Sequence, residues 1–122
     1  MSGSILIIED NEQNMYLMRF MLENGGYRVR EALDGRVGLR LAEEETPQAI
    51  LLDIQLPEMD GYAVAAALRK IPALAAVPII AVTSFAMPGD RERVMAAGAT
   101  DYIEKPINPD TFVDQLRKYL QS

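Results

Sequence analysis

Five residues able to bind a cation or a phosphate stand where apolar runs of strand length end: Glu9, Asp10, Asp53, Thr83 and Lys105. The carboxyl ends of parallel strands meet at one edge of a sheet, so these side chains are expected to converge there. Taken alone, an acid at a strand end often only caps the following helix, and a single threonine or Lys-Pro is usually structural. The joint placement of all five residues instead favours a functional site.

The chemistry of this set points to a hard cation and a phosphoryl group. Three neighbouring carboxylates repel one another and raise each other's affinity for protons. Mg²⁺ relieves that repulsion, because it prefers oxygen ligands and usually takes one or two carboxylates together with phosphate oxygens. A carboxylate can then act as the nucleophile and form an acyl phosphate. Lys105 would pair with the transferred group as a point charge, and Thr83 would donate a hydrogen bond to it.

The elements that must position these residues alternate along the chain. Short apolar or weaker strand candidates lie at residues 5–8, 27–31, 49–52, 78–82 and 101–104. Helix candidates lie at residues 11–24, 34–45, 61–70 and 89–97, with a last helix marked by Phe112, Leu116 and Leu120. Asp34 is a predicted N-cap, Gly98 a predicted C-cap, and Asn108 with Pro109 is predicted to begin the last helix. Five β-α units predict an α/β fold, a doubly wound parallel sheet covered on both faces.

Composition excludes several classes of function. The chain has 122 residues, which suits one domain spanning 1–122, and it contains no cysteine and no histidine. These absences exclude disulfide scaffolds, thiol catalysis and metal sites with histidine ligands. A net charge of −6 disfavours nucleic-acid binding. No signal peptide or membrane-length apolar stretch is present, so we expect a cytoplasmic protein that binds no membrane and forms a monomer or weak dimer.

Four segments carry a family resemblance: residues 5–11 (ILIIEDN), 51–61 (LLDIQLPEMDG), 81–84 (AVTS) and 102–106 (YIEKP). In this order and spacing, over essentially the whole chain, they resemble the motifs of receiver domains of two-component response regulators. The stretch 83–90 (TSFAMPGD) is similar to DivK-type single-domain regulators and to receivers within hybrid sensor kinases. The resemblance implies a CheY-like, flavodoxin-like five-stranded sheet with strand order 2-1-3-4-5.

The resemblance also implies a role for each site residue. Asp53 occupies the phosphoacceptor position, with Thr83 and Lys105 as the contacts to the phosphoryl group. Glu9, Asp10, Asp53 and the backbone carbonyl of Gln55 match the Mg²⁺ site. Three further residues match family positions: Tyr102 the aromatic that moves on activation, Pro106 a cis proline, and Ser84 a position that is often alanine.

The implied function is that of a phosphorylation switch rather than an enzyme. A histidine kinase or a histidine phosphotransfer protein would donate the phosphoryl group. An output protein would bind the face between Gly89 and Leu120. Gln55 and Phe85 are expected to overlook the path of attacking water, and the apolar Phe85 favours a phosphorylated state that lasts minutes or more.

Three alternatives stay open at this point. The chain could be a receiver cut from a hybrid sensor kinase. It could be a Mg²⁺-dependent phosphohydrolase with an aspartyl nucleophile, but Gln55 then stands where such an enzyme needs an acid. It could be a flavin mononucleotide carrier, but the sequence Glu9-Asp10-Asn11 would repel a phosphate that has no metal beside it.

Overall fold

The computed structural model describes residues 3–56, 60–84 and 89–120. Its strands and helices alternate as the sequence predicted, and apart from the start of the last helix their ends differ by a residue or so. The strands are β1 (Ser4–Ile8), β2 (Arg28–Ala32), β3 (Ala49–Asp53), β4 (Ile79–Thr83) and β5 (Asp101–Glu104). The helices are α1 (Glu12–Asn24), α2 (Gly35–Glu44), α3 (Gly61–Arg69), α4 (Asp90–Ala97) and α5 (Phe112–Leu120).

The strands form one parallel sheet in the order β2-β1-β3-β4-β5, which confirms the expected topology. β1, β3 and β4 are buried along their whole length, because both faces of the sheet are covered, and this explains their continuous apolar runs. In the register, Asp53 of β3 pairs with Val82 of β4, and Thr83 of β4 pairs with Glu104 of β5. The strands therefore end together, at the edge where the predicted site residues stand.

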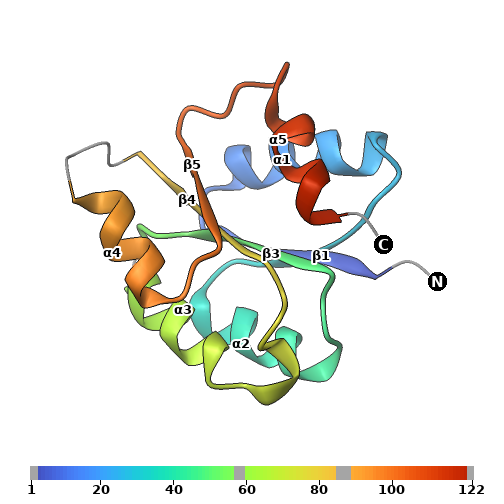
Figure 1. Ribbon diagram of the computed structural model, residues 1–122. Coiled ribbons are helices and arrows are strands. Elements are labelled where there is room, and N and C mark those ends of the chain that lie inside the picture. Colours follow the sequence, from blue (N-terminus) through green and yellow to red (C-terminus); the bar gives the residue numbers. More distant parts are fainter. Residues whose placement is uncertain (1–2, 57–59, 85–88, 121–122) are drawn as a thin grey trace.

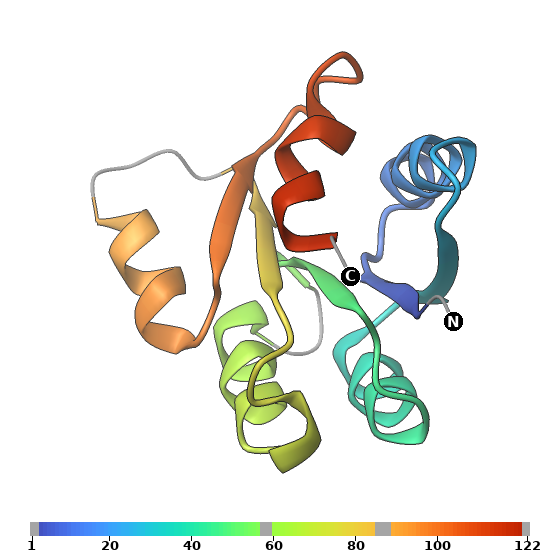
Figure 2. The ribbon, with the colours of Figure 1, turned by 45° about the vertical axis from the view of Figure 1, so that its right-hand side comes forward.

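Two helical layers enclose the sheet, with α1 and α5 on one face and α2, α3 and α4 on the other (Figures 1 and 2). Each layer has its own apolar core. On the first face Met15 and Met18 of α1 pack with Phe112 of α5. On the second, Ala42 and Val64 pack against the opposite side chains of the same strands. No helix in the described ranges is long and apolar enough to cross a membrane.

Side chains and glycines cap several helix ends, and two of these caps, Asp34 and Gly98, were predicted from the sequence. The side chain of Asn11 caps α1, and that of Asp34 accepts a hydrogen bond from the Val37 amide and caps α2. Gly25 ends α1, and Gly98 ends α4 as predicted. These caps satisfy backbone groups that a helix end leaves unpaired.

Two local predictions were wrong. α5 begins at Phe112, because the Asn108 side chain accepts a hydrogen bond from the Asp110 amide and closes a turn ahead of the helix. Asparagine forms such turns readily, so it does not mark a helix start by itself. A short 3-10 helix at Pro72–Leu74, between α3 and β4, was not predicted; its three residues are too few to carry a periodic signal.

Candidate functional site

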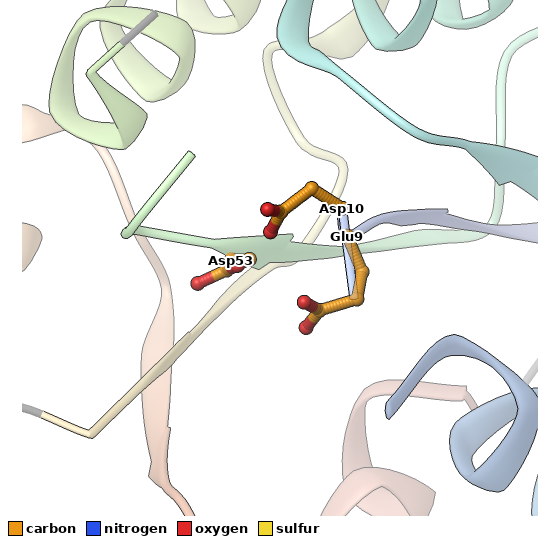
Figure 3. A group of neighbouring side chains, drawn as sticks. All are labelled: Glu9, Asp10 and Asp53. Carbon is orange, nitrogen blue, oxygen red and sulfur yellow. The ribbon is translucent and has the colours of Figure 1, made fainter. Parts of the chain in front are cut away.

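The predicted acids meet at the carboxyl edge of the sheet. Glu9 and Asp10 directly follow β1, and Asp53 is the last residue of the neighbouring strand β3 (Figure 3). Each of the three offers one carboxylate oxygen, and these oxygens lie within 4.8 Å of one another. Glu9 and Asp53 are buried, whereas Asp10 is exposed. Asp10 is therefore the acid of the cluster that is most open to solvent.

Lys105 supplies the positive charge next to this cluster. Its Nζ lies 3.2 Å from Glu9 Oε1 and 3.4 Å from Asp53 Oδ1, and the lysine side chain is only 14% exposed. The backbone amide of Lys105 donates to the carbonyl of Thr83, which fixes the lysine to the end of β4. One cation thus contacts two of the three acids but can balance the charge of only one, so a net negative charge remains at the rim.

The carboxylate of Glu9 shows most clearly that the negative charge of the cluster is only partly compensated. Its Oε2 accepts a hydrogen bond from the Asn11 amide, but Oε1 is buried without a hydrogen-bond donor among the described residues. The nearby Lys105 ammonium attracts it without hydrogen-bond geometry. Burial raises the pKa of Glu9 to about 7, and the negative charge of Asp53 adds to this shift. A native structure keeps such a group mainly where a ligand or ion completes it.

Asp10 is perturbed in the same direction. Its pKa is raised because its carboxylate loses hydration and because it hydrogen-bonds with Asp53. The residue is exposed, so solvent screens the effect. Both flanking acids consequently favour protonation at this edge, as carboxylates do when they share a site without a cation.

Gln55 and Ser84 form the rim beside Asp53. The Gln55 amide donates to Asp53 Oδ1 at 2.9 Å. The side-chain oxygen of Gln55 accepts hydrogen bonds from Ser84 Oγ at 2.6 Å and from the Ser84 amide at 3.3 Å. Sequence reasoning singled out Gln55 for its backbone carbonyl and missed this link, because nothing in the spacing of the two residues indicates it.

Three further predicted residues lie on or next to β4 and β5. Thr83 is buried at the end of β4. The Lys105-Pro106 peptide bond is cis, as expected from the resemblance. Tyr102 is half-buried and packs against the core shared with α3 and α4. Phe85, expected to guard the path of water, lies outside the described residues.

Comparison with known proteins places this chain in a family. The model of the response regulator receiver domain matches residues 5–117. The polar-differentiation response regulator DivK of Brucella ovis is 44% identical over 120 residues, covering 98% of each chain. Both matches extend over the strand ends that carry the acids, Thr83 and Lys105.

Solved structures agree in fold. The chemotaxis protein CheY4 of Vibrio cholerae is 28% identical with a TM-score of 0.93, covering 98% of this chain and 100% of its own. The receiver domain of the sensor histidine kinase PA1611 of Pseudomonas aeruginosa is 38% identical with a TM-score of 0.90, covering all of both chains. That structure has a magnesium ion coordinated in its active-site cleft. By sequence and by fold, the chain belongs to the receiver domain family of response regulators.

Proposed function

We propose that this receiver domain accepts a phosphoryl group on Asp53, and that Mg²⁺ bound by the neighbouring acids is required. The observation that carries the proposal is the convergence of Glu9, Asp10 and Asp53, whose carboxylate oxygens lie within 4.8 Å of one another, with one buried Glu9 oxygen that no described residue supplies with a hydrogen bond. Asp53 is the acid that touches both Lys105 and the Gln55 amide, so its carboxylate is held in place for attack.

The residues present fit a magnesium ion. Three carboxylates and a backbone carbonyl are all-oxygen donors, which suits Mg²⁺ better than a soft metal, and the chain has no thiol or imidazole to compete. Glu9, Asp10, Asp53 and the carbonyl of Gln55 would hold the ion. When bound, Mg²⁺ neutralises negative charge on the carboxylates and on the incoming phosphoryl oxygens.

Lys105 and Thr83 complete the proposed site. The Lys105 ammonium already lies 3.4 Å from Asp53 Oδ1 and can pair with a phosphoryl oxygen bonded to that carboxylate. The Thr83 hydroxyl, buried at the end of the adjacent strand, can donate a hydrogen bond to the same group. The attack forms a bond between the Asp53 carboxylate and phosphorus, and it breaks the bond between phosphorus and the donor.

The donor is a histidine kinase or a histidine phosphotransfer protein, since response regulator receivers work with such proteins. The output surface is the α4-β5-α5 face, defined by residues 89–120. A hollow of about 290 Å³ between β5 and α5, lined in part by Tyr102, Gln115 and Tyr119, supports that assignment. Tyr102 borders both this hollow and the core under α4, so its position can report the state of the site to the surface.

The test is Mg²⁺-dependent labelling by acetyl phosphate, followed by intact mass. The unmodified protein should gain one phosphoryl group with Mg²⁺ and almost none with chelator. Asp53→Asn removes the nucleophile and should abolish labelling. Asp60 is an exposed acid that caps the start of α3, so Asp60→Asn should leave labelling unchanged. Labelling that persists in Asp53→Asn, or that ignores chelator, would refute the proposal.

A phosphohydrolase receives no support from the site. The residue two positions after Asp53 is Gln55, whose side-chain oxygen is engaged by Ser84, and an amide cannot protonate a leaving group.

A further inference from the structure

A hydrogen bond between two rim side chains bridges the loops on either side of Asp53. Ser84 Oγ donates to Gln55 Oε1 at 2.6 Å, and the Ser84 amide donates to the same oxygen at 3.3 Å. Both residues are exposed, so neither contact is needed to satisfy a buried group. A link of this kind contributes little to folding, and its position suggests another role.

The two residues are attached directly to the reacting strands. Gln55 lies two residues beyond Asp53, and its amide donates to Asp53 Oδ1 at 2.9 Å. Ser84 follows Thr83, the last residue of β4. β3 and β4 are neighbours, and the Ile54 amide continues their pairing by donating to the Val82 carbonyl. The Ser84–Gln55 bond therefore joins the two loops at the point where both leave the sheet beside the phosphoacceptor.

The bond also fixes the orientation of the Gln55 amide. Its oxygen receives both donors of Ser84, so the NH₂ group must point away from Ser84. Without the Ser84 hydroxyl only the longer bond from the Ser84 amide would remain, and the Gln55 side chain would be free to turn into solvent.

We propose that Ser84 is a positioning residue: its hydroxyl holds the Gln55 side chain across the rim of the acid pocket and thereby limits access to Asp53 by small molecules. The inference rests on the proposed function of Asp53. The restriction applies to any reagent that must reach phosphorus or the carboxylate in line, so it slows both gain and loss of the phosphoryl group.

Both reactions can be written in full. In labelling, an Asp53 oxygen attacks the phosphorus of acetyl phosphate, the phosphorus–oxygen bond to acetyl breaks, and acetate leaves. In hydrolysis, a water oxygen attacks the same phosphorus, the bond to Asp53 breaks, and inorganic phosphate and a free carboxylate result, with the water proton released to solvent. Neither step needs Ser84 or Gln55 as an acid or base.

The experiment measures both rates at saturating Mg²⁺ by intact mass. Ser84→Ala and Gln55→Ala should each raise the rate of labelling by acetyl phosphate and the rate of hydrolysis of the phosphoprotein by about twofold to fivefold. This factor corresponds to the free energy of one exposed neutral hydrogen bond. The double variant should match the singles, because both remove the same link. Ser84→Thr keeps the hydroxyl and should restore the original rates.

The controls separate the two proposals. Thr46→Ala removes an exposed hydroxyl at the opposite end of β3 and should change neither rate. Mg²⁺ affinity should be the same in Ser84→Ala as in the unmodified protein. Unchanged rates in Ser84→Ala, a change in only one of the two rates, multiplying effects in the double variant, or altered Mg²⁺ affinity would each overturn the positioning role. Absence of labelling in the unmodified protein would instead refute the function of Asp53.

Discussion

The charged side chains at the two ends of the sheet differ in how completely the protein pairs them. At the amino ends of β4 and β5, the Arg69 guanidinium donates to four neutral acceptors at 2.8–3.0 Å: the carbonyls of Gly98, Leu74 and Val77, and the hydroxyl of Thr100. At the carboxyl ends, three acids lie close together, and one buried oxygen of Glu9 has no hydrogen-bond donor in the part of the chain that the structure describes.

The difference shows which end is built for stability and which for binding. Arg69 ties α3, α4 and the start of β4 together, so its contacts are complete within the protein. The negative charge of Glu9, Asp10 and Asp53 is balanced only when a cation binds to them. Functional sites commonly carry such destabilising groups, and the rest of the fold compensates for them.

Arg69→Met should give the largest effect. It keeps much of the side chain's apolar bulk but removes four hydrogen bonds, and the carbonyls of Gly98 and Val77 lose the Arg69 donor while Leu74 and Thr100 keep a backbone donor. The free energy of unfolding should therefore fall by roughly 3 kcal/mol. Urea unfolding measures this. Arg40→Met is the matched control, because that arginine is exposed and its one ion pair among the described residues is the i,i+4 pair with Glu44. An Arg69→Met protein as stable as the control would show that the guanidinium contacts are dispensable.

Glu9→Gln should change the free energy of unfolding in the opposite direction. Without Mg²⁺ at about pH 8, the neutral amide removes a buried, poorly compensated charge and should raise the free energy of unfolding by about 1–2 kcal/mol. Glu12→Gln, at an exposed position at the start of α1, should change it little. If Glu9→Gln destabilised the metal-free protein, the ion pair with Lys105 would outweigh the burial of Glu9.

The pH dependence follows from the raised pKa of Glu9. The folded, metal-free protein holds a proton on Glu9 up to about pH 7, whereas the unfolded chain releases it near 4.5. The folded state therefore binds more protons in this window, and stability is lost as the pH rises through it. Mg²⁺ binds the charged form, so the Tm increase produced by Mg²⁺ should be larger at about pH 8 than at about pH 5.5.

Differential scanning fluorimetry at the two pH values checks this expectation. Glu9→Gln serves as the control, since its Mg²⁺-dependent shift should vary less with pH. A Tm increase that is equal at both pH values in the unmodified protein would mean that Glu9 is charged in the metal-free fold throughout the window.

The smallest effect is expected for Mg²⁺ binding by Lys105→Ala. An ammonium cannot ligate a cation, and it repels one placed beside Glu9 and Asp53, so its removal should leave Mg²⁺ affinity unchanged or raise it by about twofold to tenfold. Isothermal titration with Mg²⁺ measures this, with Lys70→Ala at an exposed position on the C-cap of α3 as control. Strongly weakened binding in Lys105→Ala would contradict the arrangement.

Residue order predicted most of the fold and the members of the site. Continuous apolar runs mark buried parallel strands, and the residues that end them must meet at one edge, so Asp53, Thr83 and Lys105 could be placed together without coordinates. The start of α5 could not be predicted, because Asn108 can cap either a helix or a turn. The Ser84–Gln55 link depends on side-chain directions in two loops, and the burial of the Glu9 oxygen depends on packing around it. Neither has a period or spacing that a sequence reveals.

The central claim is that Asp53 receives the phosphoryl group, and site mapping tests it most directly. Borohydride reduction of the protein labelled by acetyl phosphate converts the phosphorylated aspartate into homoserine, which peptide mass spectrometry locates. The account predicts homoserine at position 53 alone, in samples labelled with Mg²⁺ and not in samples treated with chelator. Homoserine at position 10, or a phosphate that survives reduction on Ser84 or Thr83, would contradict it.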